Sequence, residues 1–319
     1  MIEFVQKREV LVKKDIDWLA VTALVTAMLV WASSFIALKS AIGPLGPMSV
    51  IFGRMFVASL CFVYFIKSFT KLKFNKDDIK YIVLMVFFEP CLYFIFEAKA
   101  LQYTSAGQAG MITSMMPLIT AVAAGIILKE LITKRLIVGA LLAVGGAVWL
   151  SLVTSSSENA SNPLLGNTLE FFAMVCGAGY AITIRHLSEK FSALFLTAIQ
   201  SFAGAIFFFP FAVWEYNNIG FTFDLDAMIW TVYLGVVVTL GGYGMFNFAL
   251  GRIEASKAAV YINLIPIFAL LLAFFVLGEK LGFIELVASA VILSGVFISQ
   301  MPTERLKQAH IRRKARKQQ

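Results

Sequence analysis

Long apolar stretches alternate with short polar segments along most of the chain. Each stretch is about 20 residues long, which is the length that a helix needs to cross a hydrocarbon core of roughly 30 Å. A membrane β-barrel would instead show short strands of alternating polarity. We therefore predict an all-α integral membrane protein with ten membrane-spanning helices, at residues 18–38, 48–66, 81–101, 107–128, 136–153, 168–184, 192–213, 227–248, 257–277 and 281–300. The sixth is the weakest, because Glu170 and several glycines dilute it.

The composition agrees with lipid as the surrounding solvent. Of the 319 residues, 60% are hydrophobic and 14% are charged, and the mean hydropathy is +0.83. An average soluble domain has about 45–50% apolar and about 25% charged residues. These totals exclude a disordered chain, a coiled coil and a secreted disulfide scaffold. The three cysteines, Cys61, Cys91 and Cys176, all fall within apolar stretches, where we interpret them as small buried hydrophobic residues.

The few basic residues are strongly biased toward alternate polar segments. If there are ten spans, 23 of the 27 Lys and Arg residues lie on one side of the membrane, and Lys39, Arg54, Lys99 and Lys280 are the exceptions. The positive-inside rule then places both termini in the cytoplasm. The net charge of +8 is explained by contact with anionic lipid and gives no reason to expect a nucleic-acid partner.

The chain also matches itself at a constant offset of 149 residues. Residues 100–148 and 249–297 are identical at ten positions, including the pairs Pro117/Pro266, Glu130/Glu279 and Gly146/Gly295. Apolar helices share Leu and Ala by chance, but aligned Pro, Glu and Gly are harder to dismiss. The paired glutamates fall at helix ends, where we expect them to cap or pack.

Each half then holds five spans, so the second half is inverted in the membrane relative to the first. We divide the chain into a cytoplasmic arm (1–17), a first five-helix repeat (18–153), an external linker (154–167), a second five-helix repeat (168–300) and a basic cytoplasmic tail (301–319). Inverted repeats recur in secondary transporters, whose substrate site lies near the midplane between the repeats. The two related halves supply the two conformations that alternating access requires.

The repeated segments resemble a known family. They read "ALQYTSAGQAGMITSMMPLITAVAAGIILKE" and "ALGRIEASKAAVYINLIPIFALLLAFFVLGE", and together with Arg54 in "GRMF" and Tyr243 and Asn247 near "AL" they look like the EamA family of the drug/metabolite transporter superfamily. The resemblance covers about residues 18–300 and implies ten helices in two repeats with cytoplasmic termini. Lys129 departs from the pattern, since Gly278 stands before the glutamate in the second repeat. The motifs indicate the fold and leave the substrate open.

Polar side chains near mid-span are the candidates for substrate binding. Ionisable groups there are costly and therefore suggest function. Glu89 lies nine residues after Lys80, or ~13.5 Å into the membrane, and the following Pro90 loosens the helix. Glu89 is the proton-coupling candidate, with a structural pairing as the alternative. The candidates for substrate binding are Trp31, Glu89, Tyr93, Ser114, Tyr180, Tyr243, Asn247, Tyr261 and Asn263.

Two further charges within spans, Arg54 and Glu97, are the candidates for a structural ion pair, because isolated charges there would be expensive. Aromatic rings among the candidates can hold an amphipathic or cationic ligand, although packing explains any single ring as well. The sequence holds only two histidines, His186 and His310, and no cluster with metal-ligand spacing. We therefore expect neither a metal nor a cofactor, and no enzymatic activity.

These features favour a secondary active transporter of the plasma membrane. We expect it to export a small neutral, zwitterionic or cationic metabolite, such as an amino acid, by alternating access, with proton coupling as an open possibility. A membrane-embedded enzyme would need clustered catalytic groups at one depth. An exchanger of phosphometabolites or nucleotide sugars would need several cavity cations, and only Arg54, with Lys39 and Lys99 at the outer rim, could serve. The expected partners are the substrate and membrane lipid, with protons as an open possibility, and we expect a monomer or a homodimer.

Overall fold

The computed structural model describes residues 17–69, 72, 74–127, 132–154, 157, 160–220, 222–250, 252 and 261–300. Of the side chains at 68, 124, 127, 185, 219, 247, 250 and 300 nothing is described. Within these residues the chain is helical, apart from turns and one isolated β-bridge between Ser157 and Ala160. The expected all-α membrane fold is therefore confirmed.

The helices follow one another with short connections. In chain order they are α1 (Trp18–Leu45), α2 (Pro47–Val63), α3 (Ile66–Phe69), α4 (Lys76–Val86), η1 (Phe87–Leu92), α5 (Tyr93–Tyr103), α6 (Ala106–Thr113), α7 (Met116–Ile127), α8 (Lys134–Val153), α9 (Pro163–Leu187), α10 (Ala193–Ile219), α11 (Leu225–Tyr233), η2 (Leu234–Gly242), α12 (Tyr243–Leu250), α14 (Leu264–Leu277) and α15 (Phe283–Gln300). The short π-helical turns η1 and η2 join α4 to α5 and α11 to α12, so each of these runs forms one long helix with a local irregularity.

The helices coincide with the predicted spans. Seven are long and apolar enough to cross a membrane: Trp18–Leu45, Lys76–Tyr103, Ala106–Ala123, Lys134–Val153, Pro163–Ile184, Ala193–Asn218 and Leu225–Phe246. Three further apolar helices are shorter: Pro47–Val63, Leu264–Leu277 and Phe283–Ser299. The predicted ninth span begins at residues 257–260, which lie outside the described part of the chain. The count of ten crossings and the position of the termini therefore stay predictions.

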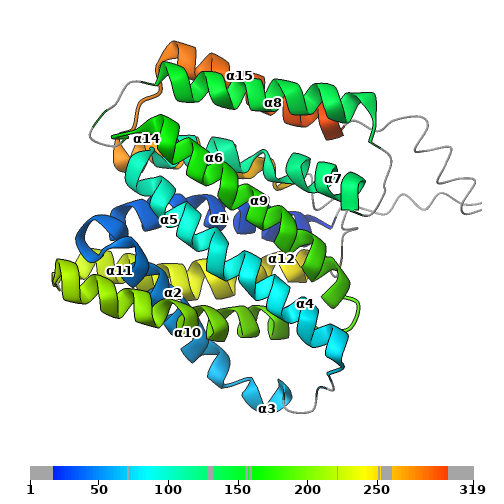
Figure 1. Cartoon of the computed structure of the whole chain (residues 1–319), viewed down its shortest axis with the longest axis vertical. Coiled ribbons are helices and arrows are strands. Elements are labelled where there is room, and N and C mark those ends of the chain that lie inside the picture. Colours follow the sequence, from blue (N-terminus) through cyan, green and yellow to red (C-terminus); the bar gives the residue numbers. More distant parts are fainter. Residues whose placement is uncertain are drawn as a thin grey trace, which may run out of the picture.

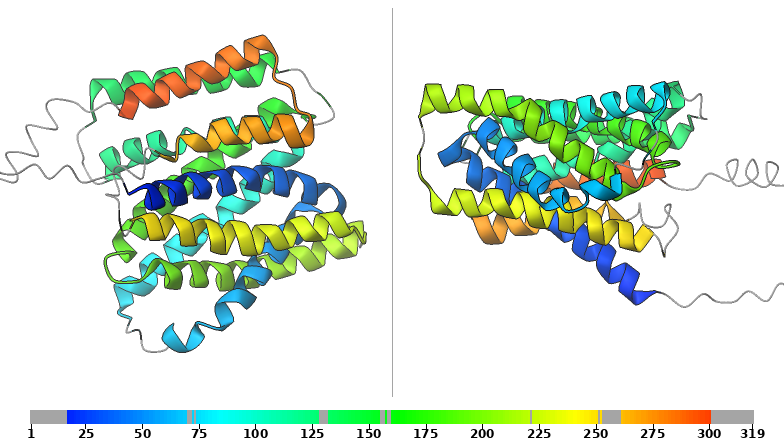
Figure 2. Two further views of the ribbon diagram at one scale, coloured as in Figure 1. Left: turned by 180° about the vertical axis from the view of Figure 1, so that it is seen from behind. Right: turned by 90° about the horizontal axis from the view of Figure 1, so that it is seen from below.

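The helices lie across the long axis of the molecule (Figure 1). Helices α8 and α15 pair at one end, and α2 packs along α10 toward the other end. Between these pairs, α5 packs against α9, α6 against α14, and α1 against both α14 and the run from α11 to α12. Figure 2 shows the same order from behind. Most of these contacts join the first half of the chain to the second, so the two halves share one core.

The outer surface carries large apolar side chains. Ile206 on α10, Phe275 on α14 and Phe283 on α15 are 76%, 76% and 81% exposed. Monomeric soluble proteins rarely show such a continuous apolar surface. The protein is therefore a multi-pass membrane protein whose outer faces meet lipid.

Two buried glutamates cap helices of the first half from the second half. Glu279 accepts hydrogen bonds from the backbone N–H groups of Ala106 and Gly107, both at 3.0 Å, at the start of α6. Glu215 accepts from the backbone N–H and the hydroxyl of Ser49, at 2.7 and 2.8 Å, near the start of α2. The expected capping role is confirmed for Glu279, while Glu130 lies outside the described residues. Carboxylates at helix N-termini also compensate the positive end of the helix dipole.

Gly46 makes the second of these caps possible. It separates α1 from α2 with a positive φ of 81°, a conformation that favours glycine. A Cβ atom at this position would lie 2.4 Å from the carboxyl carbon of Glu215. The sharp turn therefore needs glycine both for its backbone angle and for the approach of the carboxylate.

The pairing of α8 with α15 depends on glycines that the sequence repeat aligns. A Cβ atom at Gly146 would meet the backbone nitrogen of Ile292 at 2.9 Å, and one at Gly295 would meet the backbone nitrogen of Ala143 at 2.6 Å. Small residues of this kind let membrane helices approach closely. A Cβ at Gly145, the neighbour of Gly146, would meet nothing within 4 Å.

We therefore predict opposite effects for two adjacent substitutions. Gly146→Ala should lower the free energy of unfolding by about 1–3 kcal/mol, because the two helices must move apart. Gly145→Ala should leave it unchanged or raise it by up to about 1 kcal/mol through helix propensity. Thermal unfolding of both variants in detergent measures the difference. Equal melting temperatures would contradict the close contact.

Candidate functional site

The long helix from α4 to α5 is broken at Glu89. This residue has φ −144° and ψ 118°, which is extended backbone inside an otherwise helical run. The next residue, Pro90, has no backbone N–H and cannot continue the helical hydrogen bonding. The carbonyl of Glu89 accepts a hydrogen bond from the side-chain amide of Gln200 on α10 at 3.2 Å. The carboxyl of Glu89 accepts one from the hydroxyl of Tyr243 on α12 at 3.3 Å. The break therefore turns a glutamate toward the second half of the chain.

A cavity of about 430 Å³ lies against this break. The volume is within the range of small-molecule sites, roughly 300–1,000 Å³. Both halves of the chain form its wall. Its aromatic lining consists of Trp31, Phe35, Tyr93, Phe94, Tyr180, Tyr243 and Phe246, and its charged lining consists of Arg54, Glu89 and Glu97.

The aromatic wall is a packed unit. The ring centroid of Trp31 lies 5.3 Å from that of Tyr243, in an edge-on arrangement, and 5.1 Å from that of Phe246. Gly242 leaves room for this, because a Cβ atom there would lie 2.5 Å from the indole nitrogen of Trp31. The rings of α1 and α12 are therefore held in fixed relative positions on one side of the cavity.

The charged groups have different close partners. Arg54 donates from Nε to the hydroxyl of Thr239 at 3.3 Å, and its guanidinium lies over the ring of Phe94 at 4.5 Å. Glu97 accepts a hydrogen bond from the hydroxyl of Tyr93 at 3.0 Å. Both side chains are buried and face the same cavity. Their direct ion pair stays a prediction, since the nearest partners described are other groups.

Comparison with known proteins identifies the family. The model of the EamA-like transporter family matches residues 18–152 and 164–301 of this chain. The chain belongs to the EamA-like transporter family. This EamA protein is accordingly a transporter of the drug/metabolite transporter superfamily, as the sequence motifs implied.

Individual relatives are similar over nearly the whole chain. An uncharacterized transporter, YetK of Bacillus subtilis (strain 168), is 26% identical over 91% of this chain and 88% of its own length. A probable terminal-alkyne amino-acid exporter of Streptantibioticus cattleyicolor is 23% identical over 88% of this chain and 92% of its own. A crystal structure of a protein with 15% identity aligns with a TM-score of 0.58 over 90% of this chain and 98% of that one, which shows the shared fold.

The cavity of this EamA protein gathers part of the predicted site. Trp31, Glu89, Tyr93, Tyr180 and Tyr243 all line it. Their roles in binding stay predictions, but their positions agree with the proposed site.

Three other candidates lie elsewhere. Ser114 is buried and donates its hydroxyl hydrogen to the carbonyl of Met111 at 2.6 Å, within its own helix. Tyr261 packs against the apolar cluster that includes Leu24 and against the main core, and it is not part of the cavity lining. Asn263 is half-buried directly before α14 and is not part of the cavity lining. The side chain of Asn247 lies outside the described part of the structure.

Sequence reasoning missed Gln200 and Thr197, which lie in the first third of α10. Gln200 holds the carbonyl of Glu89 and accepts a hydrogen bond from the hydroxyl of Tyr180 at 3.5 Å. Thr197 lines the cavity. An uncharged amide inside an otherwise apolar span was the available signal, since polar groups in membrane helices seek partners on other helices.

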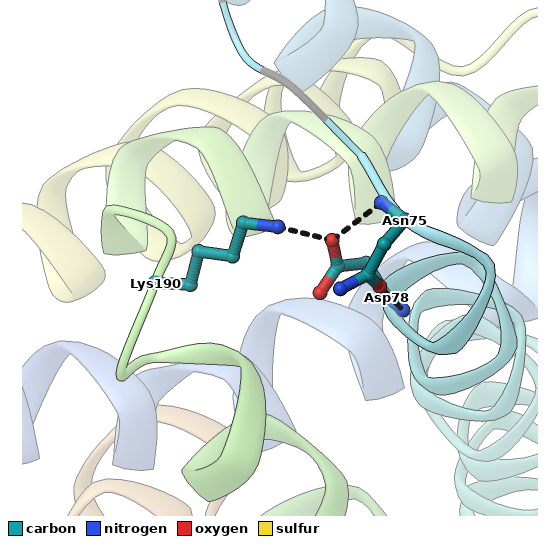
Figure 3. Close-up of polar contacts among 3 residues, drawn as sticks. All are labelled: Asn75, Asp78 and Lys190. Atoms are coloured by element: carbon teal, nitrogen blue, oxygen red, sulfur yellow. Dashed lines mark hydrogen bonds and ion pairs between the residues drawn. The ribbon is translucent and has the colours of Figure 1, made fainter.

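One end of the cavity reaches the turn between α9 and α10, where Ser188 and Ala193 belong to its lining. Beside it, Lys190 forms an ion pair with Asp78 at the start of α4 (Figure 3). Asp78 also completes a capping box with Asn75, in which each side chain accepts a hydrogen bond from the other residue's backbone N–H, at 2.7 and 2.8 Å. The ion pair thus ties the α9–α10 turn to a rigid helix end.

The described part of the chain contains no group of three or more His, Cys, Asp or Glu side chains placed to hold a metal ion.

The contact between Gln200 and the broken helix can be tested by stability. Gln200→Leu should lower the free energy of unfolding by about 1–3 kcal/mol, because the Glu89 carbonyl loses its partner in a buried position. Thr197→Val is the control, since the Thr197 hydroxyl bonds to the carbonyl of Ala193 in its own helix, and it should change stability by less than about 0.5 kcal/mol. Thermal unfolding in detergent distinguishes the two. A Gln200 variant as stable as the control would refute the positioning role.

Proposed function

We propose that this EamA protein is a secondary active transporter that exports a small zwitterionic, cationic or neutral metabolite, such as an amino acid, across the plasma membrane. The observation that carries the proposal is the cavity at the break in the α4–α5 helix, where aromatic side chains and charges of both signs come together from both halves. A relative named as a probable exporter of terminal-alkyne amino acids supports this substrate class.

The charges of the cavity suit a zwitterion. The guanidinium of Arg54 can receive a substrate carboxylate in a charge-assisted hydrogen bond. Glu89 and Glu97 can receive an ammonium group, and the aromatic faces add cation–π attraction. Arg54 is the sole cation among the cavity-lining residues described, which disfavours phosphorylated metabolites and nucleotide sugars. These lining residues include no His or Cys, so they offer little to a membrane-embedded enzyme.

We further propose ten spans in two inverted five-helix repeats, residues 18–153 and 168–300, joined by an external linker at 154–167. When the helices of each half are matched in order, α2 pairs with α10, α6 with α14 and α8 with α15, and these are the pairs that pack together. The packing of α5 on α9 corresponds to that of α12 on α1. The family model also matches two segments of similar length. This exchange symmetry supports alternating access, in which each half takes the other's conformation.

Cysteine accessibility tests the orientation. In a variant without native cysteines (Cys61→Ser, Cys91→Ala, Cys176→Ala), Ser161→Cys after α8 should react with a membrane-impermeant thiol reagent in intact cells. Ser188→Cys in the α9–α10 turn should react only after the cells are permeabilised. Both serines are exposed in the structure, so access depends on the side of the membrane. Reaction of both on the same side would contradict the proposed topology.

Glu89 is our candidate for proton coupling, because it joins the cavity, the helix break and Tyr243 in one place. Glu89→Gln keeps the size of the side chain and an acceptor for Tyr243, but it cannot bind and release a proton. In proteoliposomes, we expect the flux driven by a pH gradient to be about tenfold lower for this variant than for the wild type, or lower still. Uptake of a panel of labelled L-amino acids measures this flux.

Glu285→Gln is the matched control, since Glu285 lies at the start of α15 and accepts a hydrogen bond from the backbone of Gly282, away from the cavity. It should transport like the wild type. Flux of Glu89→Gln that is as fast and as pH-responsive as the wild type would remove Glu89 from the coupling mechanism.

A further inference from the structure

Glu170 on α9 is a buried carboxyl group that the cavity does not account for. Its side chain is 0% exposed and is not part of the cavity lining. It lies behind Thr113, which does line the cavity, with Thr113 Oγ1 3.2 Å from Glu170 Oε1. Within the described residues, Glu170 Oε2 has no hydrogen-bond partner.

The hydrogen bonds around Thr113 bear on the protonation of Glu170. The Thr113 hydroxyl also lies 3.0 Å from the backbone carbonyl of Ala109, which can only accept. A hydroxyl has one hydrogen and cannot serve both acceptors fully. Both contacts are satisfied when Glu170 carries a proton and donates it from Oε1 to Thr113 Oγ1. Oε2 is then the carbonyl oxygen of a neutral acid, which is far less costly to bury than an ionised carboxylate without a partner.

A second glutamate, Glu97, lies on the neighbouring helix α5. Helix α5 runs antiparallel to α9, with the ring of Tyr93 beside Gly177 and the backbone of Tyr103 beside Gly166. The rings of Phe96 and Phe172 lie 5.8 Å apart and set the register between these points. Glu97 on α5 therefore lies at about the level of Glu170 on α9.

The other helices packed against α9 bring no compensating cation to this level. The described residues of α6 and α7 include no ionisable side chain. On α8, the cations Lys134 and Arg135 lie in the first turn. The contact with α9 near Glu170 is made at the opposite end of α8, where Ser151 accepts a hydrogen bond from Asn167. The charged residues of α4 and Glu89 of η1 lie toward the other end of α9, where Asp78 meets Lys190.

Polar side chains continue from Glu170 to the end of the bundle. Asn167 lies one turn before Glu170 on α9 and donates hydrogen bonds to Gln108 and to Ser151, both at 3.0 Å. Gln108 in turn donates to the hydroxyl of Thr154 at 3.0 Å, at the half-exposed end of α8. These contacts form a polar column that begins at Asn167, one turn from Glu170, and ends at the surface.

We propose that Glu170 and Glu97 form a proton-binding site behind the cavity wall, in which Glu170 holds the proton. Glu97 lines the cavity, and the polar column begins one turn from Glu170 and leads to the end of the bundle. Glu170 itself lies outside the cavity lining that contains Glu89, so the site can be tested without a substrate.

Infrared spectroscopy of the purified full chain in lipid nanodiscs tests the site without a substrate. We expect the wild type to show the carbonyl band of a protonated carboxylic acid at pH 7.5, and Glu170→Gln to lack it. Glu215→Gln is the matched control, because buried Glu215 accepts two hydrogen bonds at a helix N-terminus, as an ionised carboxylate does. The band should persist in Glu215→Gln and in Glu89→Gln.

A second variant keeps the test decisive if Glu170→Gln does not fold. Thr113→Val removes the hydrogen-bond partner of the acid and should shift the band to higher frequency. The proposal is overturned if the wild type has no such band, if the band survives in folded Glu170→Gln, or if Thr113→Val leaves its frequency unchanged. It is also overturned if replacing N-methyl-D-glucamine with sodium abolishes the band, because a metal cation would then occupy the site. Failure of the transport assays would leave this result unaffected.

Discussion

Every backbone polar group within the membrane must find a partner inside the protein, because lipid offers none. The break at Glu89 is where this constraint shapes the molecule most. Pro90 interrupts the helical hydrogen bonds, and the carbonyl of Glu89 is recovered by Gln200 from a helix of the other half. Irregular backbone at membrane depth is tolerated where it is buried in protein or lines a cavity, and here it does both. The cavity, the aromatic wall and the charged lining are all arranged around this one irregularity.

The same constraint explains how the two halves hold each other. Helix N-termini leave unpaired N–H groups, and in α6 and α2 these are met by Glu279 and Glu215 from the second half. Lipid tails are as apolar as leucine side chains, so apolar contact alone does little to favour one helix neighbour over lipid. The polar caps are specific, because only the matching carboxylate satisfies the N–H groups. Close glycine contacts between α8 and α15 add shape complementarity at the other side of the molecule. The two halves are therefore held together by specific polar contacts as well as by close packing.

The charges that remain inside the protein fall into two groups. Arg54, Glu89 and Glu97 face the cavity, where a substrate can complete their interactions. Glu170 is buried behind Thr113, whose hydroxyl is its hydrogen-bond partner. Burying an isolated charge is expensive, and this is why we propose a charged metabolite as the partner of the first group and a proton for the second.

Much of this arrangement follows from the sequence alone. The length of each apolar stretch predicted where the helices lie, because lipid imposes a fixed thickness on every span. Aligned residues such as Gly146 and Gly295 separately predicted the internal duplication. The depth of a residue in the membrane can be counted from the nearest polar end of its span. Residues chosen near mid-span in this way include five that line the cavity: Trp31, Glu89, Tyr93, Tyr180 and Tyr243. Ser114, Tyr261 and Asn263 are not among the lining residues, and their roles in binding stay predictions.

Only the tertiary structure decided which face each helix turns inward. A membrane helix is apolar toward lipid as well as toward its neighbours, so its pattern does not mark a buried side. The partnership of Gln200 with Glu89 joins residues 111 positions apart, and that of Thr113 with Glu170 joins residues 57 apart. Such contacts depend on the rotation of each helix about its axis and on the pairing of helices across the two halves. Local sequence carries neither quantity, and the packing of the whole bundle sets both.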